Sequence, residues 1–347
     1  NADAERMMFK EDRCNDCGDC FVQCLYADFS RDAAIREIQS LKRSENAMIL
    51  KQCITCMACN EYCPTGANPY DLILRMQEEK KMHFVQPGVA DFIEQTLTAV
   101  PNEIIPGDPD KPALNLCVMG HAYPPDITES KMFADLTLVR GSDYFSRVVF
   151  LHTGMESRVR THAQRYVDNL TKLNKREIVF MHDDCYAMVA KKAAEYGITV
   201  PFKAVHIIEY MLGYLRKHDR SIMKLNKKVA YQRPCISRYT PEKEPALDVL
   251  FELIGVERVA RRYDRKNALC CAFGLRESDP VRGEQILKRN LDDALEHDAD
   301  AMVFLCPGCY WLTSGACEDR GLAAIFITDL CRMALGEIHF SSRPWKT

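Results

Sequence analysis

The spacing of hydrophobic residues changes near residue 112, and this change divides the chain into two kinds of structure. Before it, apolar residues recur at helical intervals over 32–50, and a second helix is expected to begin near Pro69 with its apolar side reaching Met76. Residues 91–100 continue the helical pattern. After it, short apolar segments alternate with amphipathic helices, which is typical of α/β layers.

Prolines mark the boundary between the two parts. Pro101, the segment 106–109 and Pro112 predict a linker over 101–112. Beyond it, five apolar segments have the length of strands: 114–118, 147–152, 177–182, 227–232 and 301–306.

The second part of the chain also repeats itself. Three pairs of segments correspond: 182–186 with 306–310 at an offset of 124 residues, Cys117 with Cys235, and Leu151-His152 with Cys270-Cys271. We therefore expect a helical domain at 1–100, the linker at 101–112, and two related α/β lobes at 113–225 and 226–347. The predicted fold class is α+β overall, with a pseudo-duplicated α/β domain after the helical one.

Cysteine is the unusual part of the composition, with 17 among 347 residues. The hydrophobic share of 47% and the charged share of 27% are ordinary, and a net charge of −3 gives no reason to expect nucleic acid as a partner. We find no apolar run of 18 residues and expect no leader and no membrane span. So many cysteines without signs of secretion indicate metal binding in a reducing compartment, the cytoplasm.

Two cysteine runs in the first hundred residues have the bacterial ferredoxin spacing C-x2-C-x2-C-x3-C. In such a run three thiols bind one cluster and the fourth ligates the other. This predicts two cubane [4Fe–4S] clusters, one held by Cys14, Cys17, Cys20 and Cys63, the other by Cys53, Cys56, Cys59 and Cys24. Zinc is the competing metal, but the spacing is not that of a zinc finger.

Five further cysteines follow the pattern C-x34-CC-x34-C-x2-C: Cys235, Cys270, Cys271, Cys306 and Cys309. Zinc needs only four ligands, and adjacent cysteines form a disulfide only with strain. Each interval has the length of about one strand plus one helix, so the thiols are expected on successive loops at one end of a sheet. Five thiolates gathered there suit an iron–sulfur cluster.

This spacing resembles the CCG domain of heterodisulfide reductases, with Ala272 where that family usually has glycine. The resemblance implies that the five cysteines are catalytic and hold a non-cubane [4Fe–4S] cluster that cleaves disulfides one electron at a time. The first lobe keeps only Cys117 and Cys185, with His152 and His182 at former ligand positions. We interpret it as a lobe retained for its fold; whether these four residues bind zinc or a Rieske-like cluster stays open.

The helix between the two ferredoxin runs makes the first domain resemble the α-helical ferredoxin module of heterodisulfide reductases and succinate dehydrogenases. The whole chain resembles the catalytic subunit of membrane-linked heterodisulfide reductase and the iron–sulfur subunit of the sulfite-reductase-linked membrane complex. The resemblance implies an oxidoreductase subunit of anaerobic metabolism that carries electrons through both cubanes to the third cluster and a disulfide. It also implies flavin-containing or membrane haem and quinone subunits as partners, on the cytoplasmic side of a membrane complex.

The alternative function is a relay subunit without a substrate of its own, in a flavin-based bifurcating or quinone-linked complex such as the benzoyl-CoA reductase type. A cluster at the five cysteines that is accessible from outside would favour the enzyme, and a cluster enclosed by protein would favour the relay.

The sulfur substrate, the electron donor, the partners and the direction of electron flow do not follow from the sequence. Arg233, Arg238 and Arg276 are candidates for raising the potential of a nearby cluster and for gripping an anionic substrate. We expect Cys317 and Cys331 in the core.

Overall fold

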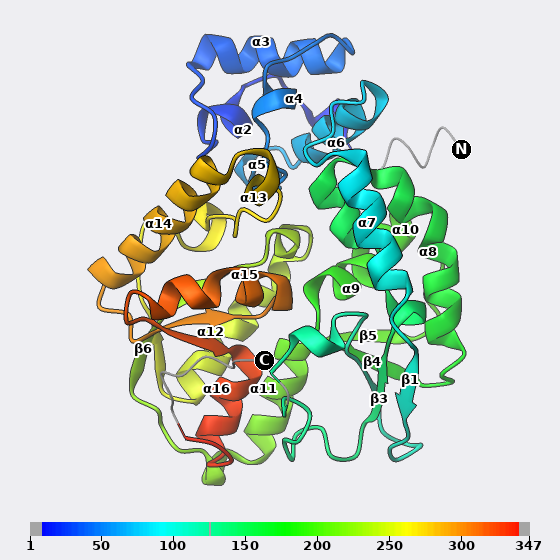
Figure 1. Cartoon of the computed structure of the whole chain (residues 1–347), viewed down its shortest axis with the longest axis vertical. Helices are drawn as coiled ribbons and strands as arrows, with labels where there is room; N and C mark the ends of the chain where they lie inside the picture. Colours follow the sequence, from blue (N-terminus) through cyan, green and yellow to red (C-terminus); the bar gives the residue numbers. More distant parts are fainter. Residues whose placement is uncertain (1–8, 125, 340–347) are drawn as a thin grey trace.

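The computed structural model describes residues 9–124 and 126–339, which form a helical module and two α/β lobes (Figure 1). The helical module lies at one end of the molecule, and both lobes meet it (Figure 1). Its elements are a short 3-10 helix at Glu11–Arg13 and the helices α2 (Asp19–Val22), α3 (Arg31–Lys42), α4 (Ile49–Gln52), α5 (Ala58–Tyr62), α6 (Pro69–Glu79) and α7 (Pro87–Thr98).

The ends of these helices follow from local sequence. The helix expected over 32–50 is divided into α3 and α4. The Ser30 side chain caps α3 by accepting a hydrogen bond from the amide of Ala33. Pro69 opens α6 as predicted, because its fixed φ suits a first helical turn that needs no amide donor there. Helix α7 runs down along the first lobe, where Arg158 and Arg147 form ion pairs with Glu94 (Figure 1).

The two lobes have the same sheet topology, which agrees with the predicted duplication. The first sheet has the order β1-β3-β2-β4-β5 and the second β7-β6-β8-β9. Without the antiparallel edge strand β1, each is a four-stranded parallel sheet in which the first strand lies between the second and the third. The strands are β1 (Glu103–Ile105), β2 (Ala113–Asn115), β3 (Thr137–Arg140), β4 (Glu177–Phe180), β5 (Lys203–His206), β6 (Lys227–Gln232), β7 (Val256–Arg258), β8 (Ala301–Phe304) and β9 (Ala323–Phe326).

Two expectations about local structure are wrong. The apolar segment 147–152 is not a strand: Val148–Thr153 forms a buried 3-10 helix, and the strand in this region is β3. A short apolar run has the same pattern in a buried strand and in a buried helical turn, so periodicity could not separate them. The expected linker 101–112 is not only a connection, because β1 within it pairs with β3.

One hydrophobic core runs through both lobes. It combines Leu114 of β2 and Val179 of β4 with Val229 of β6 and Val303 of β8. The helices of the lobes are α8 (Glu156–Thr171), α9 (Asp183–Ala187), α10 (Ala193–Glu195), α11 (Ile207–Lys217), α12 (Glu244–Leu253), α13 (Leu275–Ser278), α14 (Pro280–Glu296), α15 (Pro307–Glu318) and α16 (Ile327–Ala334). None of the helices in the described ranges combines the length and apolar content that crossing a membrane requires.

A buried ionic group also joins the two lobes. Asp183, at the start of α9, accepts hydrogen bonds from Lys243 Nζ at 2.8 Å and from the Ser237 hydroxyl, both in the second lobe. It also contacts His206 Nε2 at 2.5 Å, and Asp183 is fully buried. Burial alone would raise the pKa of this carboxyl, but the Lys243 charge keeps it below its ordinary value.

Replacing Lys243 with Met should therefore destabilise the protein by about 3–5 kcal/mol, because it leaves the Asp183 carboxylate buried without its cation. The Lys203→Met variant is the control, since Lys203 pairs with Glu177 at the surface and such pairs contribute about 0–1 kcal/mol. Urea unfolding of the anaerobically purified variants measures both changes. Equal losses in the two variants would show that the buried pair does not hold the lobes together.

Candidate metal centres

The two cysteine loops of the helical module have the same backbone form. In each loop, the second and the fourth residue after the first cysteine have a positive φ, in the left-handed region. These residues are Asp16 and Gly18 in one loop, and Thr55 and Met57 in the other. In a residue other than glycine this conformation costs roughly 1–2 kcal/mol. It turns amides toward sulfur, as in the hydrogen bond from the Thr55 amide to Cys53 Sγ at 3.3 Å. Both loops are therefore shaped around their thiols.

The eight thiols of these loops lie close to one another. Burial raises the pKa of Cys20, and so do the thiols around it: Cys63, Cys14 and Cys17. Burial and neighbouring thiols likewise raise the pKa of Cys59; its neighbours are Cys53, Cys20, Cys56 and Cys24. A cavity of about 20 Å³ lies against the second predicted set. These neighbours are compatible with the crossed ligand pattern, although Cys20 of the first predicted set also lies near Cys59, and both the ligand sets and the clusters stay predictions.

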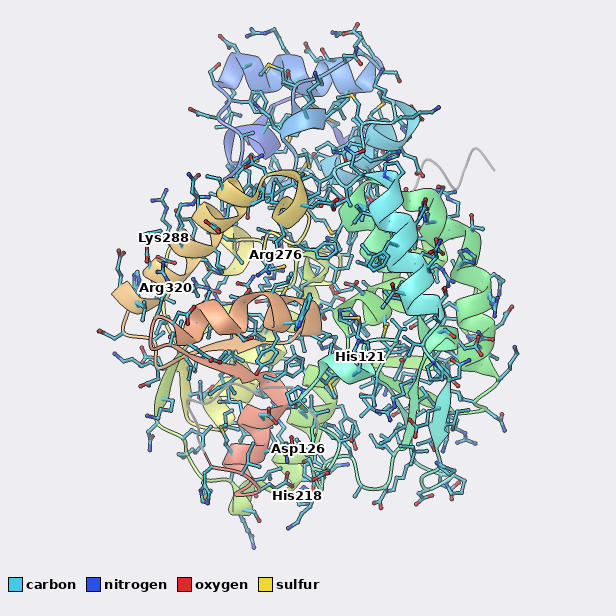
Figure 2. All side chains as sticks on the ribbon, in the orientation of Figure 1. His121, Asp126, His218, Arg276, Lys288 and Arg320 are labelled. Carbon is cyan, nitrogen blue, oxygen red and sulfur yellow. The ribbon has the colours of Figure 1, made fainter. Side chains whose placement is uncertain are left out.

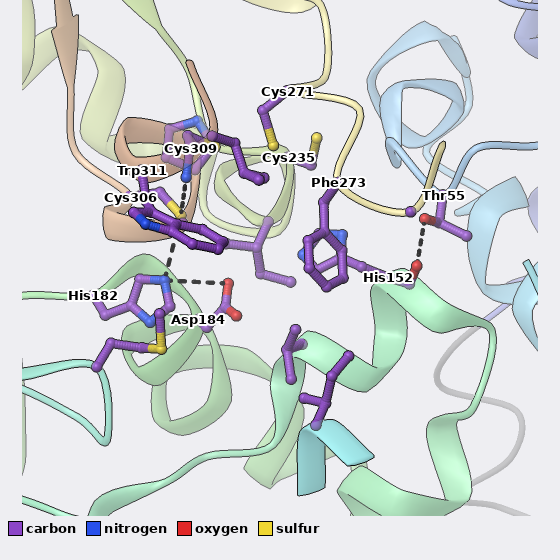
Figure 3. Close-up of a pocket in the computed structure, with 18 of the residues that line it drawn as sticks. Thr55, His152, His182, Asp184, Cys235, Cys271, Phe273, Cys306, Cys309 and Trp311 are labelled. Carbon is purple, nitrogen blue, oxygen red and sulfur yellow. Dashed lines mark hydrogen bonds and ion pairs between the residues drawn. The ribbon is translucent and has the colours of Figure 1, made fainter. Parts of the chain in front are cut away.

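The five cysteines of the second lobe meet where its parallel strands end. Cys235 begins the 3-10 helix Cys235–Tyr239 that follows β6, and Cys306 and Cys309 lie at the start of α15, after β8. Cys270 and Cys271 lie in the loop that follows β7. Loops at the carboxyl ends of parallel strands meet at one edge of the sheet, which is why residues so distant in sequence converge (Figure 3).

These five side chains form a continuous series of thiol contacts. Cys270 contacts both Cys235 and Cys271, Cys271 contacts Cys309, and Cys309 contacts Cys306. Hydrogen bonds from Cys270 and Cys309 lower the pKa of the Cys271 thiol to about 6. A hydrogen bond from Cys309 and another from His182 lower the pKa of Cys306 to about 5, against the effect of burial.

The lowered pKa values of Cys271 and Cys306 favour the thiolate, which is the form that binds metal. Cys306 is also the N-cap of α15, where its sulfur accepts a hydrogen bond from the Cys309 amide at 3.5 Å and the helix dipole favours a negative charge. Three of the five cysteines are buried and two, Cys271 and Cys306, are half-buried, and a set of five sulfur donors with this charge fits an iron–sulfur cluster.

Ala272, directly after the cysteine pair, has a φ of +61°. This is the left-handed region, which favours glycine, so the structure accounts for the glycine expected at this position. The conformation lets the Ala272 amide donate to Cys270 Sγ at 3.3 Å. Alanine keeps the turn at a cost of roughly 1–2 kcal/mol.

Tyr26 connects the helical module to the five-cysteine site, and sequence reasoning missed it because nothing marks a lone tyrosine. Its hydroxyl accepts a hydrogen bond from the amide of Cys270 at 2.7 Å. Burial and the thiols of Cys56, Cys270 and Cys235 raise the pKa of Tyr26. Cys56, Cys235 and Cys270 also share one hydrophobic cluster. The three groups of thiols therefore follow one another, with the Cys56 group in the middle.

The hypothesis that Arg233 and Arg238 grip an anionic substrate is wrong. Arg233 is 1% exposed and forms ion pairs with Glu61 of α5 and Glu244 of α12. Arg238 is also buried and donates to the carbonyl of Ala268 at 2.8 Å. Arg238 also pairs with Glu61 at 3.5 Å, so both arginines join the second lobe to the helical module. Arg276 is exposed and donates to the carbonyl of Leu312 (Figure 2).

A cavity of about 270 Å³ opens beside the five cysteines, between the two lobes (Figure 3). The thiols form one wall, and most of the other lining residues are apolar, among them Leu97, Phe145 and Phe273. Phe92 and Trp311 also line it and are 68% and 73% exposed, which is unusual for large apolar residues. Its ionisable side chains, apart from the cysteines, are His152, His182 and Asp184.

The remaining candidates lie as follows. Cys117, His182 and Cys185 converge in the first lobe. His152 lines the cavity, and its carbonyl accepts a hydrogen bond from the Thr55 hydroxyl at 2.9 Å. Cys317 and Cys331 are fully buried in the core, which confirms the expectation for both.

The model of the CCG cysteine-rich domain family matches residues 229–312, from β6 into α15. One component of dihydromethanophenazine:CoB–CoM heterodisulfide reductase from Methanosarcina acetivorans is 22% identical over 291 residues, which are 74% of this chain and 70% of that protein. The Methanosarcina barkeri protein of the same name is 21% identical with the same coverage. One component of fumarate reductase (CoM/CoB) from Methanothermobacter marburgensis is 23% identical over 184 residues, 50% of this chain and 36% of that protein.

Among solved structures, a hypothetical protein from Helicobacter pylori has a similar fold, with a TM-score of 0.55 at 11% identity. The similarity covers 89% of this chain and 65% of that one. The family match falls on the lobe that carries the five thiols, and the curated relatives extend the similarity over most of the chain. The chain is a heterodisulfide reductase-like iron–sulfur protein that carries a CCG cysteine-rich domain.

Proposed function

We propose that this chain conducts electrons through two cubane clusters to a non-cubane [4Fe–4S] cluster at the five-cysteine site, and that a disulfide is reduced there. The relatives support the broader statement directly: this is an iron–sulfur electron-transfer protein with an oxidoreductase role, working with other redox subunits. The observation that carries the finer proposal is the succession of three thiol groups, in which Tyr26 joins the middle group to the last.

The ligands follow from the grouping of the thiols. Cys20 and its three neighbours would hold the outer cubane, and the group around Cys59 the middle one. The five thiols from Cys235 to Cys309 would hold the third cluster, which supplies single electrons to a sulfur–sulfur bond. The protein surrounds this site mostly with apolar side chains, and the cavity gives one side of it access to solvent.

The cavity favours the enzyme over a relay without a substrate. A relay requires only a sealed cluster close to its neighbours. Here the cluster would fill part of the 270 Å³ cavity, but the lining extends beyond the thiols to the exposed side chains of Phe92 and Trp311, so the cluster would have an open face. Arg233 and Arg238 are buried in ion pairs with Glu61 and Glu244, and Arg276, which is exposed, is not among the residues that line the cavity. We therefore infer a substrate that is apolar next to its sulfur atoms.

The proposal is tested by adding thiols to the oxidised protein under argon. The cognate thiol should produce a new paramagnetic signal, because its sulfur reaches the site through the cavity and alters the third cluster. Thiols with short apolar substituents should do so at lower concentration than thiols of the same size that carry carboxylates. If no thiol or disulfide changes the spectrum, and the intact complex turns over its substrate on a different polypeptide, the relay function stands instead.

A further inference from the structure

Arg238 lies where the helical module meets the five-cysteine site. It belongs to the 3-10 helix Cys235–Tyr239, which begins with the first of the five thiols and packs against α5 of the helical module. Its Nε atom lies 3.5 Å from a carboxylate oxygen of Glu61 in α5, and its Nη2 atom donates to the carbonyl of Ala268 at 2.8 Å. One guanidinium therefore contacts both parts of the protein that carry the thiols.

The charge of Arg238 is only partly compensated by other side chains. Its own side chain is fully buried, where a charge needs a partner. Glu61 is shared with Arg233, whose two terminal nitrogens lie 2.6 Å and 2.7 Å from its carboxylate oxygens, so Arg238 has the longer and weaker contact. Within the described part of the chain, Arg238 Nη1 is buried without a hydrogen-bond partner. A buried donor of this kind indicates a further negatively charged acceptor beside it.

Two thiols from different groups lie close enough to be affected by this charge. Burial raises the pKa of Cys56, which belongs to the middle group, and the Arg238 charge acts in the opposite direction. The hydrogen bond with Cys270 raises the pKa of Cys235, and the Arg238 charge again opposes the rise. Cys56 and Cys235 also belong to one hydrophobic cluster, where water screens charges little. Arg238 therefore acts on both thiol groups at once.

We propose that Arg238 places its positive charge between the middle cluster and the third cluster and raises the reduction potentials of both. The inference rests on the proposed function, which supplies these two clusters. Each electron that enters a cluster adds negative charge to a buried site, so the potential depends on the surrounding charge and on hydrogen bonds to the cluster sulfurs. Arg238 has both a charge and a free N–H group to offer. Because the outer cluster lies beyond the middle one, the same charge favours electrons near the five-cysteine site.

Redox titration of the anaerobically purified chain, followed by low-temperature paramagnetic spectra, measures this effect without relying on activity. The Arg238→Gln variant should lower the potentials of the middle and third clusters by at least about 59 mV, the equivalent of a tenfold change in a one-electron equilibrium, with a smaller change at the outer cluster. The Glu61→Gln variant should raise both potentials, because it removes negative charge beside the same guanidinium. A purely structural contact between the two residues would not produce shifts of opposite sign.

The Arg261→Gln variant is the matched control. Arg261 is another buried arginine of the second lobe, but it pairs with Asp293 and donates to the carbonyl of Tyr231, so its loss should leave all three potentials unchanged. The iron content of each variant reports that its clusters are intact. If Arg238→Gln loses iron, Arg238→Lys, which keeps the charge and should keep the potentials, and Glu61→Gln, which should raise them, decide the question.

Potentials that stay at the control values in Arg238→Gln, or that fall in Glu61→Gln, would overturn the inference and leave Arg238 with a structural role alone. If the chain holds about 12 iron atoms, that result would leave the proposed function intact. A chain without the middle and third clusters would overturn the inference together with the proposed function. The predicted shifts in a chain that reduces no disulfide would support the inference, although the proposed disulfide reduction had failed.

Discussion

Replacing Cys271 with serine should remove about four iron atoms per chain and abolish disulfide reduction, while both N-terminal clusters remain reducible. Cys271 is the middle residue of the thiol series, in contact with Cys270 on one side and Cys309 on the other. The pKa of its thiol is lowered to about 6, which favours the thiolate that binds iron, whereas a serine hydroxyl does not ionise at neutral pH.

Iron analysis and low-temperature spectra after dithionite reduction measure the loss and the survival of the other clusters. The Cys317→Ser variant is a matched control, because Cys317 lies on the same helix as Cys309 but is buried in the core away from the cavity. If Cys271→Ser keeps the parent's iron content and turnover, the five cysteines do not hold the catalytic cluster.

The Cys24→Ser variant should lose the middle cluster, although Cys24 belongs to the first cysteine run. Burial raises the pKa of Cys24, and the largest contribution from another side chain is that of Cys56, in the second run. The middle cluster lies between the outer one and the five-cysteine site, so its loss should interrupt electron flow. Turnover with an electron donor should fall to background even though the third cluster is intact.

Spectra of the reduced Cys24→Ser protein separate the two clusters. The matched variant is Cys14→Ser, whose thiol lies in the group around Cys20 and should affect only the outer cluster. Loss of the same signal in both variants would mean that the fourth cysteine of each run stays with its own loop. The crossed ligand pattern would then be wrong.

The spacing of cysteines predicted much of this architecture. Loops at the ends of parallel strands recur at the length of one strand plus one helix, so even intervals between Cys235, Cys270 and Cys306 already imply convergence. The internal repeat likewise predicted two lobes, and the sheets have matching strand order. These inferences succeed because the number of residues between two cysteines determines whether their loops fall at the same end of a sheet.

Features that depend on tertiary contacts were not predictable in the same way. Arg233 has the sequence context of a substrate-binding group beside Cys235, yet it is buried because Glu61, 172 residues earlier in the chain, lies against it. Tyr26 acquires its position only when the helical module docks on the second lobe. The segment Val148–Thr153 forms a 3-10 helix instead of a strand, since a short apolar run is compatible with either.

The most direct test of the central claim, a third cluster at the end of two cubanes, is the iron content of the anaerobically purified chain. Two cubanes and one non-cubane [4Fe–4S] cluster require about 12 iron atoms per chain, with about 4 of them lost in the Cys271→Ser variant. A native chain with about 8 iron atoms, and no further loss in that variant, would contradict the claim.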